Sequence, residues 1–217
     1  MRSFSEIDFV ELEKRLYEEC RRMLEDESLS KAVQFGLNPL YGPLKKNPDL
    51  ALISFQGGGA DRHVQTSAPS ELLYLSDQYK FGTSLRAHMA SAKLSSILQN
   101  STVAHAAVFP QAPTSEASKW INPRDPDRKR WVEFSSHWNE VLLRAQSPKA
   151  LIFFGEKASN AFGMQWKDIE RNHGQGHMTF ARATWNDIPA FFCHHLSISC
   201  PAAEAVRCFQ RVGEALR

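Results

Sequence analysis

Hydrophobic and polar residues change their spacing along this chain in a way that predicts alternating strands and helices. Short, nearly continuous apolar runs lie at 50–55, 103–109, 150–155 and 188–193. Apolar residues at helical spacing lie at 4–23, 84–98, 131–145, 156–162 and 201–216. Strands that are apolar on both faces and alternate with helices are typical of a mostly parallel sheet covered on both sides. We therefore predict a three-layer α/β/α protein with a mostly parallel central sheet.

The polar stretches between these elements predict loops. Residues 38–43 are rich in turn-forming residues, residues 62–69 are polar, and residues 163–182 form a long polar excursion before the last strand. Residues 110–130 combine four prolines with five lysine or arginine residues, which indicates a stiff, basic loop.

Length and composition favour a single soluble domain. The chain has 217 residues, of which 42% are hydrophobic and 23% charged, so one well-buried core can form. We expect one domain over 1–217, with an N-terminal helical segment at 1–37 and an α/β core at 38–217. The formal charge of +2 is too small to indicate nucleic-acid binding by itself, so any DNA site must come from local clusters of charge.

Cysteine spacing and hydropathy point to a reduced, cytoplasmic environment. Cys20, Cys193, Cys200 and Cys208 form no CxxC pair, and the N-terminus has no signal-peptide pattern. No apolar run approaches the roughly 18 to 20 residues that a membrane span needs. We expect a cytoplasmic monomer that contacts no membrane.

Two strand ends carry the residues with the most chemical interest. The run 50–55 leads into Gly57, Gly58 and Gly59 and then Asp61, and glycines in series suit a backbone that must approach a ligand closely. A flexible connection is the alternative explanation. The run 188–193 leads into two histidines and two serines. Ligands of open α/β sheets bind beyond the carboxyl ends of the strands, so we expect both ends to face one crevice.

In their order along the chain, these motifs resemble those of the uracil-DNA glycosylase superfamily. Phe55-Gln56-Gly57-Gly58-Gly59 stands where that family has its first motif, and His195-Leu196-Ser197-Ile198-Ser199 stands where it has a His-Pro-Ser-Pro type motif. Asn38-Pro39-Leu40-Tyr41 resembles the lead-in to the first strand, and 103–110 and 151–158 resemble the next two strands. The resemblance covers about residues 38–205.

The departures from the family pattern change what the resemblance implies. Gly57 falls where the family has the Asp or Asn that orients the attacking water, and Leu196 replaces the motif's first proline. His105 lies roughly where an Asn reads the base. Gly59 falls where uracil enzymes place a bulky aromatic side chain against C5 of the base, so a pyrimidine with a large 5-substituent would fit. Such bases occur in bacteriophage DNA, and glycosylases of this superfamily are known in phage defence.

The resemblance implies a DNA glycosylase that flips out a modified or damaged pyrimidine and hydrolyses its glycosidic bond without a cofactor, leaving an abasic site. His195 would donate a hydrogen bond to the base carbonyl, and Asp61, or His63 in its place, would activate water. Asp61 could instead cap a turn, and His195 could instead satisfy backbone groups near its strand end. The implied base pocket comprises Phe55, Gln56, Gly57, Gly58, Gly59 and His105.

DNA is the expected partner. Ser197 and Ser199 would hold a phosphate, and the basic loop would contact others through Lys119, Arg124, Arg128, Lys129 and Arg130. A solvated charge run is the alternative for each of these side chains. His173, His177, His194 and His195 lack acidic or paired-cysteine neighbours, so we expect no metal. Two other functions remain open: ordinary uracil excision, and a binding module that has lost hydrolysis.

Overall fold

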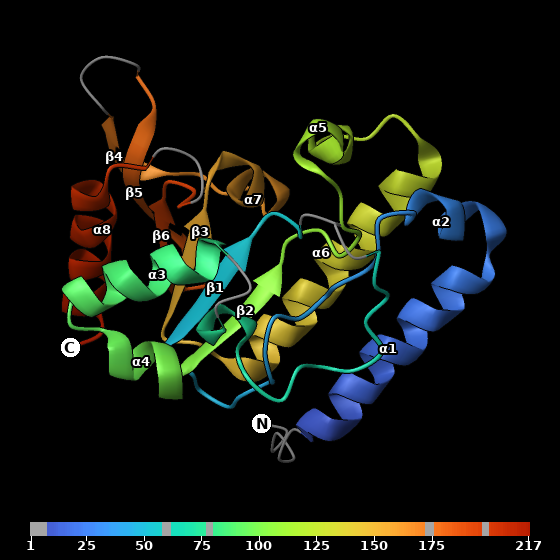
Figure 1. Ribbon diagram of the computed structural model, residues 1–217, viewed down its shortest axis with the longest axis horizontal. Helices are drawn as coiled ribbons and strands as arrows, with labels where there is room; N and C mark the ends of the chain where they lie inside the picture. The colour runs from blue at the N-terminus through green and yellow to red at the C-terminus, as the bar shows by residue number, and fades with distance from the viewer. Residues whose placement is uncertain (1–7, 58–61, 77–79, 172–175, 197–199) are drawn as a thin grey trace.

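A six-stranded sheet forms the centre of the protein (Figure 1). The computed structural model describes residues 8–57, 62–76, 80–171, 176–196 and 200–217. The strand order is β2-β1-β3-β6-β5-β4. The strands are β1 (Leu50–Ser54), β2 (Thr102–Ala106), β3 (Ala150–Phe154), β4 (Lys167–Arg171), β5 (Met178–Trp185) and β6 (Ile188–Cys193). The first four in spatial order are parallel, and β5 and β4 extend the sheet antiparallel.

Helices cover both faces of the sheet, as predicted. They are α1 (Phe9–Glu25), α2 (Glu27–Ala32), α3 (Lys80–Ser91), α4 (Ser95–Asn100), α5 (Thr114–Ala117), α6 (Pro126–Gln146), α7 (Glu156–Ala161) and α8 (Ala202–Ala215). Short 3-10 turns lie at Leu73–Leu75 and Ser118–Trp120. In Figure 1, α3 and α8 lie in front of the sheet and α6 lies behind it. The three-layer arrangement and the mostly parallel sheet are thus confirmed.

Two neighbouring residues of β3 show how the sheet is buried on both faces. Phe154 packs against Phe81 of α3 and Phe209 of α8, with ring centroids 4.9 and 6.4 Å away. Phe153 points to the other side, where the Phe162 ring after α7 lies 5.0 Å away. Successive strand side chains alternate between faces, so a strand covered on both sides must be apolar at every position.

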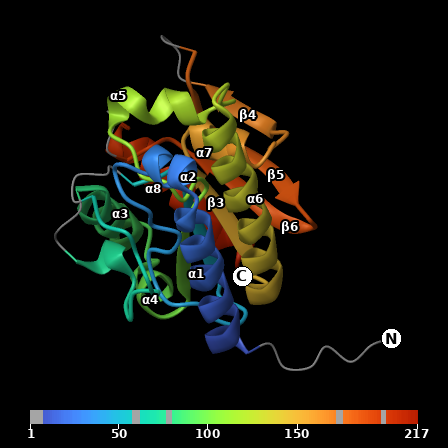
Figure 2. The same cartoon turned by 90° about the vertical axis from the view of Figure 1, so that its right-hand side faces the viewer.

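The N-terminal helix packs on the same core rather than forming a separate unit. Leu16, Tyr17 and Cys20 of α1 belong to the main hydrophobic cluster. Figure 2 shows α1 running beside the long helix α6, and the Trp138 indole N–H of α6 donates to Glu19 of α1 at 3.0 Å. The predicted helix at 4–23 is therefore confirmed over its described part.

Two predictions about elements were wrong. The single helix predicted at 84–98 is two helices, α3 and α4, because the chain turns at Lys93, whose φ is +62°. The polar excursion at 163–182 contains the antiparallel hairpin of β4 and β5. Every residue of β4 is exposed, so this edge strand has no apolar face that a sequence pattern could reveal.

The segment at 110–130, which was predicted to be a stiff, basic loop, contains helical elements. It contains α5 and the 3-10 turn that follows, and α6 already begins at Pro126, one residue after the capping Asp125. Three of the five basic residues, Arg128, Lys129 and Arg130, are therefore helical. Among the described residues, no helix is long and apolar enough to cross a membrane.

Candidate functional site

Three adjacent parallel strands end at one edge of the sheet and bring three motifs together there. Gln56 and Gly57 follow β1, Gly155 follows β3, and His194 and His195 follow β6. Gly155 has a φ of +83°, and a Cβ built on it would lie 3.4 Å from Cβ of His195. The glycine allows the turn into α7 beside the histidine, because L side chains rarely adopt that φ. The ends of β1 and β6 thus lie at one edge of the sheet, on either side of β3, and the predicted common crevice stays a prediction.

His195 is held in a setting that keeps its imidazole neutral. Its ring lies 5.3 Å from the Phe81 ring of α3. Burial lowers the pKa of His195 to about 4, with smaller contributions from His194 and Lys157. At neutral pH the imidazole carries one N–H donor and no charge. It can therefore donate a hydrogen bond to a carbonyl oxygen that gains negative charge.

A row of aromatic rings joins the end of β1 to the end of β6. The rings of Tyr41 and Tyr74 are stacked, with centroids 5.4 Å apart and planes at 19°. The Tyr74 ring lies 4.9 Å from Phe81, which in turn contacts His195. The Tyr74 hydroxyl donates to the hydroxyl of Ser54, the last residue of β1, at 3.3 Å. Tyr41 and Tyr74 are buried in the main hydrophobic cluster, and the half-buried Phe81 packs against it, so Phe81 is the ring of this row with an accessible surface. The sequence analysis missed Tyr74 and Phe81, because nothing in their local pattern distinguishes them from core residues.

The first motif is tied to the segment that follows β2. The backbone N–H groups of Ala107 and Val108 donate to the carbonyls of Ser54 and Phe55 at 2.7 and 2.8 Å. The Gln56 amide donates to the carbonyl of Pro110 at 2.9 Å, and its Oε1 is buried with no protein partner in the described part of the chain. Phe55 is buried. The end of β1 is thus fixed against the segment after β2, and the assignment of Phe55 and Gln56 to a base pocket stays a prediction.

Gly57 is crowded by two polar side chains. A Cβ at this position would lie 2.9 Å from the Tyr41 hydroxyl and 2.9 Å from Nε2 of Gln111. Real Cβ atoms essentially never approach other atoms so closely, so any larger residue would force these side chains to move. The Gln111 amide, at the end of a flexible side chain, is the group that could most easily give way. The sequence analysis did not select Gln111, whose proximity to Gly57 arises only from the pairing of the two segments.

Several predicted site residues lie outside the described residues. These are Gly58, Gly59, Asp61, Ser197 and Ser199. His63, the alternative to Asp61, is exposed, and its backbone carbonyl accepts a hydrogen bond from the N–H of Leu37 at 2.9 Å. Their assigned roles stay predictions.

The side chain of His105 is turned away from the proposed site and toward α6, which corrects its assignment to the base pocket. Its side chain is fully buried, and Nε2 lies 2.8 Å from Oε1 of Gln146, the last residue of α6. His105 pairs with Ile53 in the sheet, one residue before β1 ends, so the direction of its side chain and not its position along the strand keeps it out of the site. Strand alternation turned the side chain toward α6.

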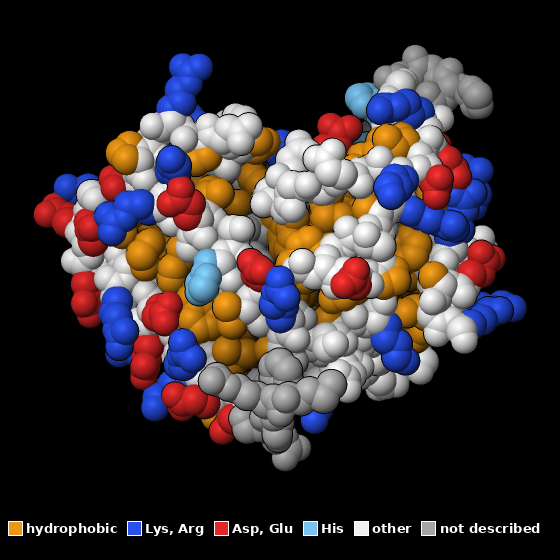
Figure 3. Space-filling model, turned by 180° about the vertical axis from the view of Figure 1, so that it is seen from behind, with side chains coloured by type: hydrophobic (Ala, Val, Ile, Leu, Met, Phe, Trp, Pro, Cys, Tyr) orange, Lys and Arg blue, Asp and Glu red, His pale blue; other side chains and the backbone are white. Residues whose placement is uncertain are grey.

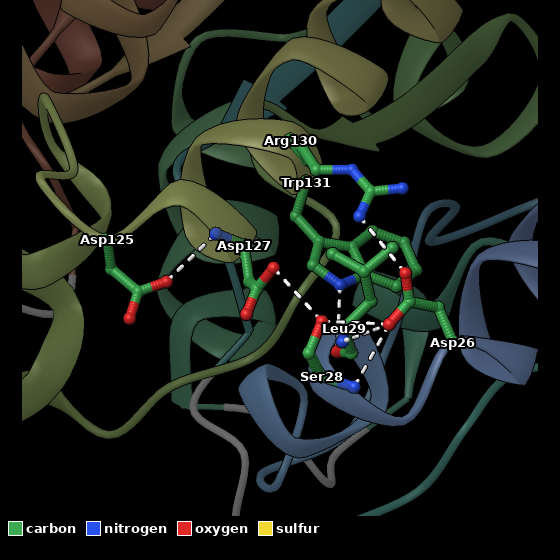
Figure 4. Close-up of polar contacts among 7 residues, drawn as sticks. All are labelled: Asp26, Ser28, Leu29, Asp125, Asp127, Arg130 and Trp131. Carbon is green, nitrogen blue, oxygen red and sulfur yellow. Dashed lines mark hydrogen bonds and ion pairs between the residues drawn. The ribbon is translucent and has the colours of Figure 1, made fainter.

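Three of the five basic side chains that were predicted to bind phosphates are engaged with carboxylates. Lys119 pairs with Glu116 at 2.7 Å, Lys129 with Glu133 at 3.8 Å, and Arg130 with Asp26 at 3.1 Å. Figure 4 shows Arg130 reaching from α6 to Asp26, the residue that caps α2. Hydrogen bonds from Ser28 and Arg130 keep the pKa of Asp26 below its usual value. The Arg130–Asp26 pair joins α6 to the start of α2, and the three ion pairs together give these basic side chains a role that needs no DNA.

Arg124 and Arg128 differ from the other three. Neither has a carboxylate within ion-pair distance in the residues that the structure describes. The Arg128 guanidinium lies 5.8 Å from the centre of the Trp120 ring. On the rear face of the molecule, lysine and arginine side chains are interspersed with aspartate and glutamate side chains (Figure 3). That face therefore offers no continuous basic band.

No cluster of three or more metal-binding side chains occurs among the described residues. Comparisons with protein-family models and with curated proteins found no match. The fold and the site define an α/β protein with a polar, aromatic-lined edge where β1, β3 and β6 end. A function must be argued from the chemistry of that edge.

Proposed function

We propose that this chain is a DNA glycosylase that hydrolyses the N-glycosidic bond of a flipped-out, modified or damaged pyrimidine. The observation that carries the proposal is the neutral His195 at the end of the aromatic row, on the same sheet edge as the glycine-rich motif. A planar base needs a stacking surface, a donor for its carbonyl and a route for water. The residues at this edge offer the first two.

His195 would act on the leaving base. As the glycosidic bond breaks, negative charge grows on the base, and a positioned neutral N–H donor stabilises that charge more in the transition state than in the ground state. A pKa of about 4 keeps His195 neutral throughout the physiological range. Contact of the base with the half-buried Phe81 ring would offset part of the cost of flipping it, which is a few kcal/mol.

DNA would approach along the strand ends. Arg124 and Arg128 are the side chains of the basic segment that remain available for phosphates, and Trp120 beside Arg128 adds a ring for stacking. Contacts from Ser197 and Ser199 belong to the same proposal. The preferred substrate is a pyrimidine with a bulky 5-substituent, because glycine stands at position 59.

The first test is abasic-site formation by the purified chain. Matched DNAs would carry cytosine, uracil or glucosylated hydroxymethylcytosine at one position, and alkaline cleavage would reveal abasic sites in the presence of a chelator. Breaks only in the DNA with the bulky base support the proposal. Breaks in uracil DNA would assign ordinary uracil excision instead. Binding without breaks would identify a binding module and overturn hydrolysis.

The matched variant for this test is His195→Ala. Loss of one preorganised donor should lower the rate of base release by about 10² to 10³ while DNA binding is retained. His137→Ala, on the exposed side of α6, serves as the control and should cleave at the wild-type rate. An unchanged rate in His195→Ala would remove this residue from the reaction.

A further inference from the structure

Gln111 reaches the place where a side chain at position 57 would have been. The N–H of Ala112 donates to the carbonyl of Gly57 at 3.1 Å, so the segment after β2 lies directly against the first motif. Nε2 of Gln111 lies 2.9 Å from the point that a Cβ on Gly57 would occupy. The missing side chain at 57 is therefore replaced in space by a carboxamide from a segment more than fifty residues further along the chain.

The backbone around Gln111 is firmly held. Its own N–H donates to the carbonyl of Gly36 at 2.8 Å, and the carbonyl of Pro110 accepts from the Gln56 amide at 2.9 Å. The residue itself is only half-buried. Its side-chain amide makes no hydrogen bond to any described residue. A side-chain amide that is accessible, makes no other hydrogen bond and extends from a fixed backbone can hold a small ligand in a defined position.

We infer that Gln111 orients the attacking water of the proposed glycosylase reaction, with the Tyr41 hydroxyl beside it. A carboxamide can accept one hydrogen bond from a water through Oε1 and donate another through Nε2. It cannot remove the proton, but glycoside cleavage passes through an oxocarbenium-like state that needs a well-placed water more than a strong base. Glutamine positions the attacking water in the same way in GTP hydrolysis. This inference rests on the proposed function.

The step balances without a cofactor. The bond between C1′ of the sugar and the base nitrogen breaks, and its electron pair leaves with the base. The water oxygen forms a bond to C1′ and releases a proton to solvent, while the departing base takes up a proton. The products are the free base and an abasic sugar with a hydroxyl at C1′.

The dependence of kcat on pH distinguishes a Gln111 that orients water from a carboxylate that acts as a general base. Gln111→Ala should lower kcat by about 10²-fold and leave KM for DNA nearly unchanged, because the group acts on water and not on the bound base. Gln111→Glu keeps the size of the side chain but introduces a titratable group. Its kcat should fall with decreasing pH as the new carboxylate is protonated, whereas wild-type kcat should stay level between pH 5 and 8.

The control is Gln99→Glu, an exposed position on α4 just before β2 and thus toward the opposite edge of the sheet. It should behave as wild type at every pH. A wild-type kcat in Gln111→Ala, or a level pH profile in Gln111→Glu, would overturn the role of Gln111 while leaving the glycosylase proposal intact. Absence of base release by the wild-type chain from every DNA would overturn both.

Discussion

Gly82 of α3 lies against the backbone of Tyr74 and permits the close approach of α3 to this residue. A Cβ at this position would lie 2.8 Å from the carbonyl oxygen and 3.1 Å from Cα of Tyr74, both of them backbone atoms that cannot rotate away. The adjacent Phe81 and Tyr74 have ring centroids 4.9 Å apart. One absent methyl group therefore sets how closely α3 approaches the turn that holds Tyr74.

Gly82→Ala should destabilise the fold by about 1–3 kcal/mol through this overpacking, less the gain in helix propensity of about 1 kcal/mol. Gly213→Ala in α8 is the matched control. A Cβ there would meet only a methyl of the Leu94 side chain, at 3.0 Å, which can rotate. It should be neutral or stabilising. Urea unfolding of both variants measures the difference, and equal midpoints would contradict the argument.

At the scale of elements, α6 anchors the segment that carries Gln111. The Ser135 hydroxyl of α6 accepts from the N–H of Phe109 at 3.0 Å and donates to the carbonyl of Trp131 at 2.7 Å. The Asn139 amide donates to the carbonyl of Ala106, the last residue of β2, at 2.9 Å. These buried polar contacts hold the segment that follows β2, and residues 37–41 pair with its outer side through β-type bridges.

Ser135→Ala should cost about 1–3 kcal/mol, because the Phe109 N–H would stay buried without an acceptor. Ser136→Ala, one residue further along the same helix and exposed, should change stability by less than about 0.5 kcal/mol. Thermal unfolding gives the stabilities. Hydrogen exchange at Phe109 should also speed up in Ser135→Ala alone, and unchanged protection would contradict the proposed anchor.

At the scale of the whole molecule, two buried histidines couple stability to pH. Burial lowers the pKa of His105 and of His195 from 6.5 to about 4 in the folded protein. The unfolded chain therefore binds protons at these sites between pH 6.5 and 4, whereas the folded chain does not. The free energy of unfolding must fall as the pH decreases through that window.

His105→Gln should make this loss of stability shallower. Glutamine can still donate to Gln146 but does not titrate, so a contribution on the order of 3 kcal/mol between pH 6.5 and 4 should disappear. His137→Gln is the control, since this residue lies on the exposed side of α6. Urea titrations at several pH values measure the slope. Identical slopes in His105→Gln and wild type would contradict the argument, because they would show that His105 binds protons equally in the folded and unfolded states.

Local pattern was enough to predict most elements of this protein. The apolar runs at 50–55, 150–155 and 188–193 match β1, β3 and β6 closely, because a strand buried on both faces must be apolar throughout. The strand β4 was not predicted, because all of its residues are exposed and it has no apolar pattern. The turn at Lys93 between α3 and α4 was not predicted, because a residue in the left-handed conformation can interrupt a helix without changing the spacing of the apolar residues.

The sequence by itself determined the α/β class, the order of the main strands and the glycine and histidine motifs at their ends, since these depend on neighbouring residues alone. Only the tertiary structure decided which side chains meet: Gln111 and Tyr41 at Gly57, Phe81 at His195, Asp26 at Arg130, and His105 with Gln146 away from the site. These contacts depend on which strands become neighbours and how segments pair across the sheet. Such long-range choices are set by packing of the whole core, which local spacing does not encode.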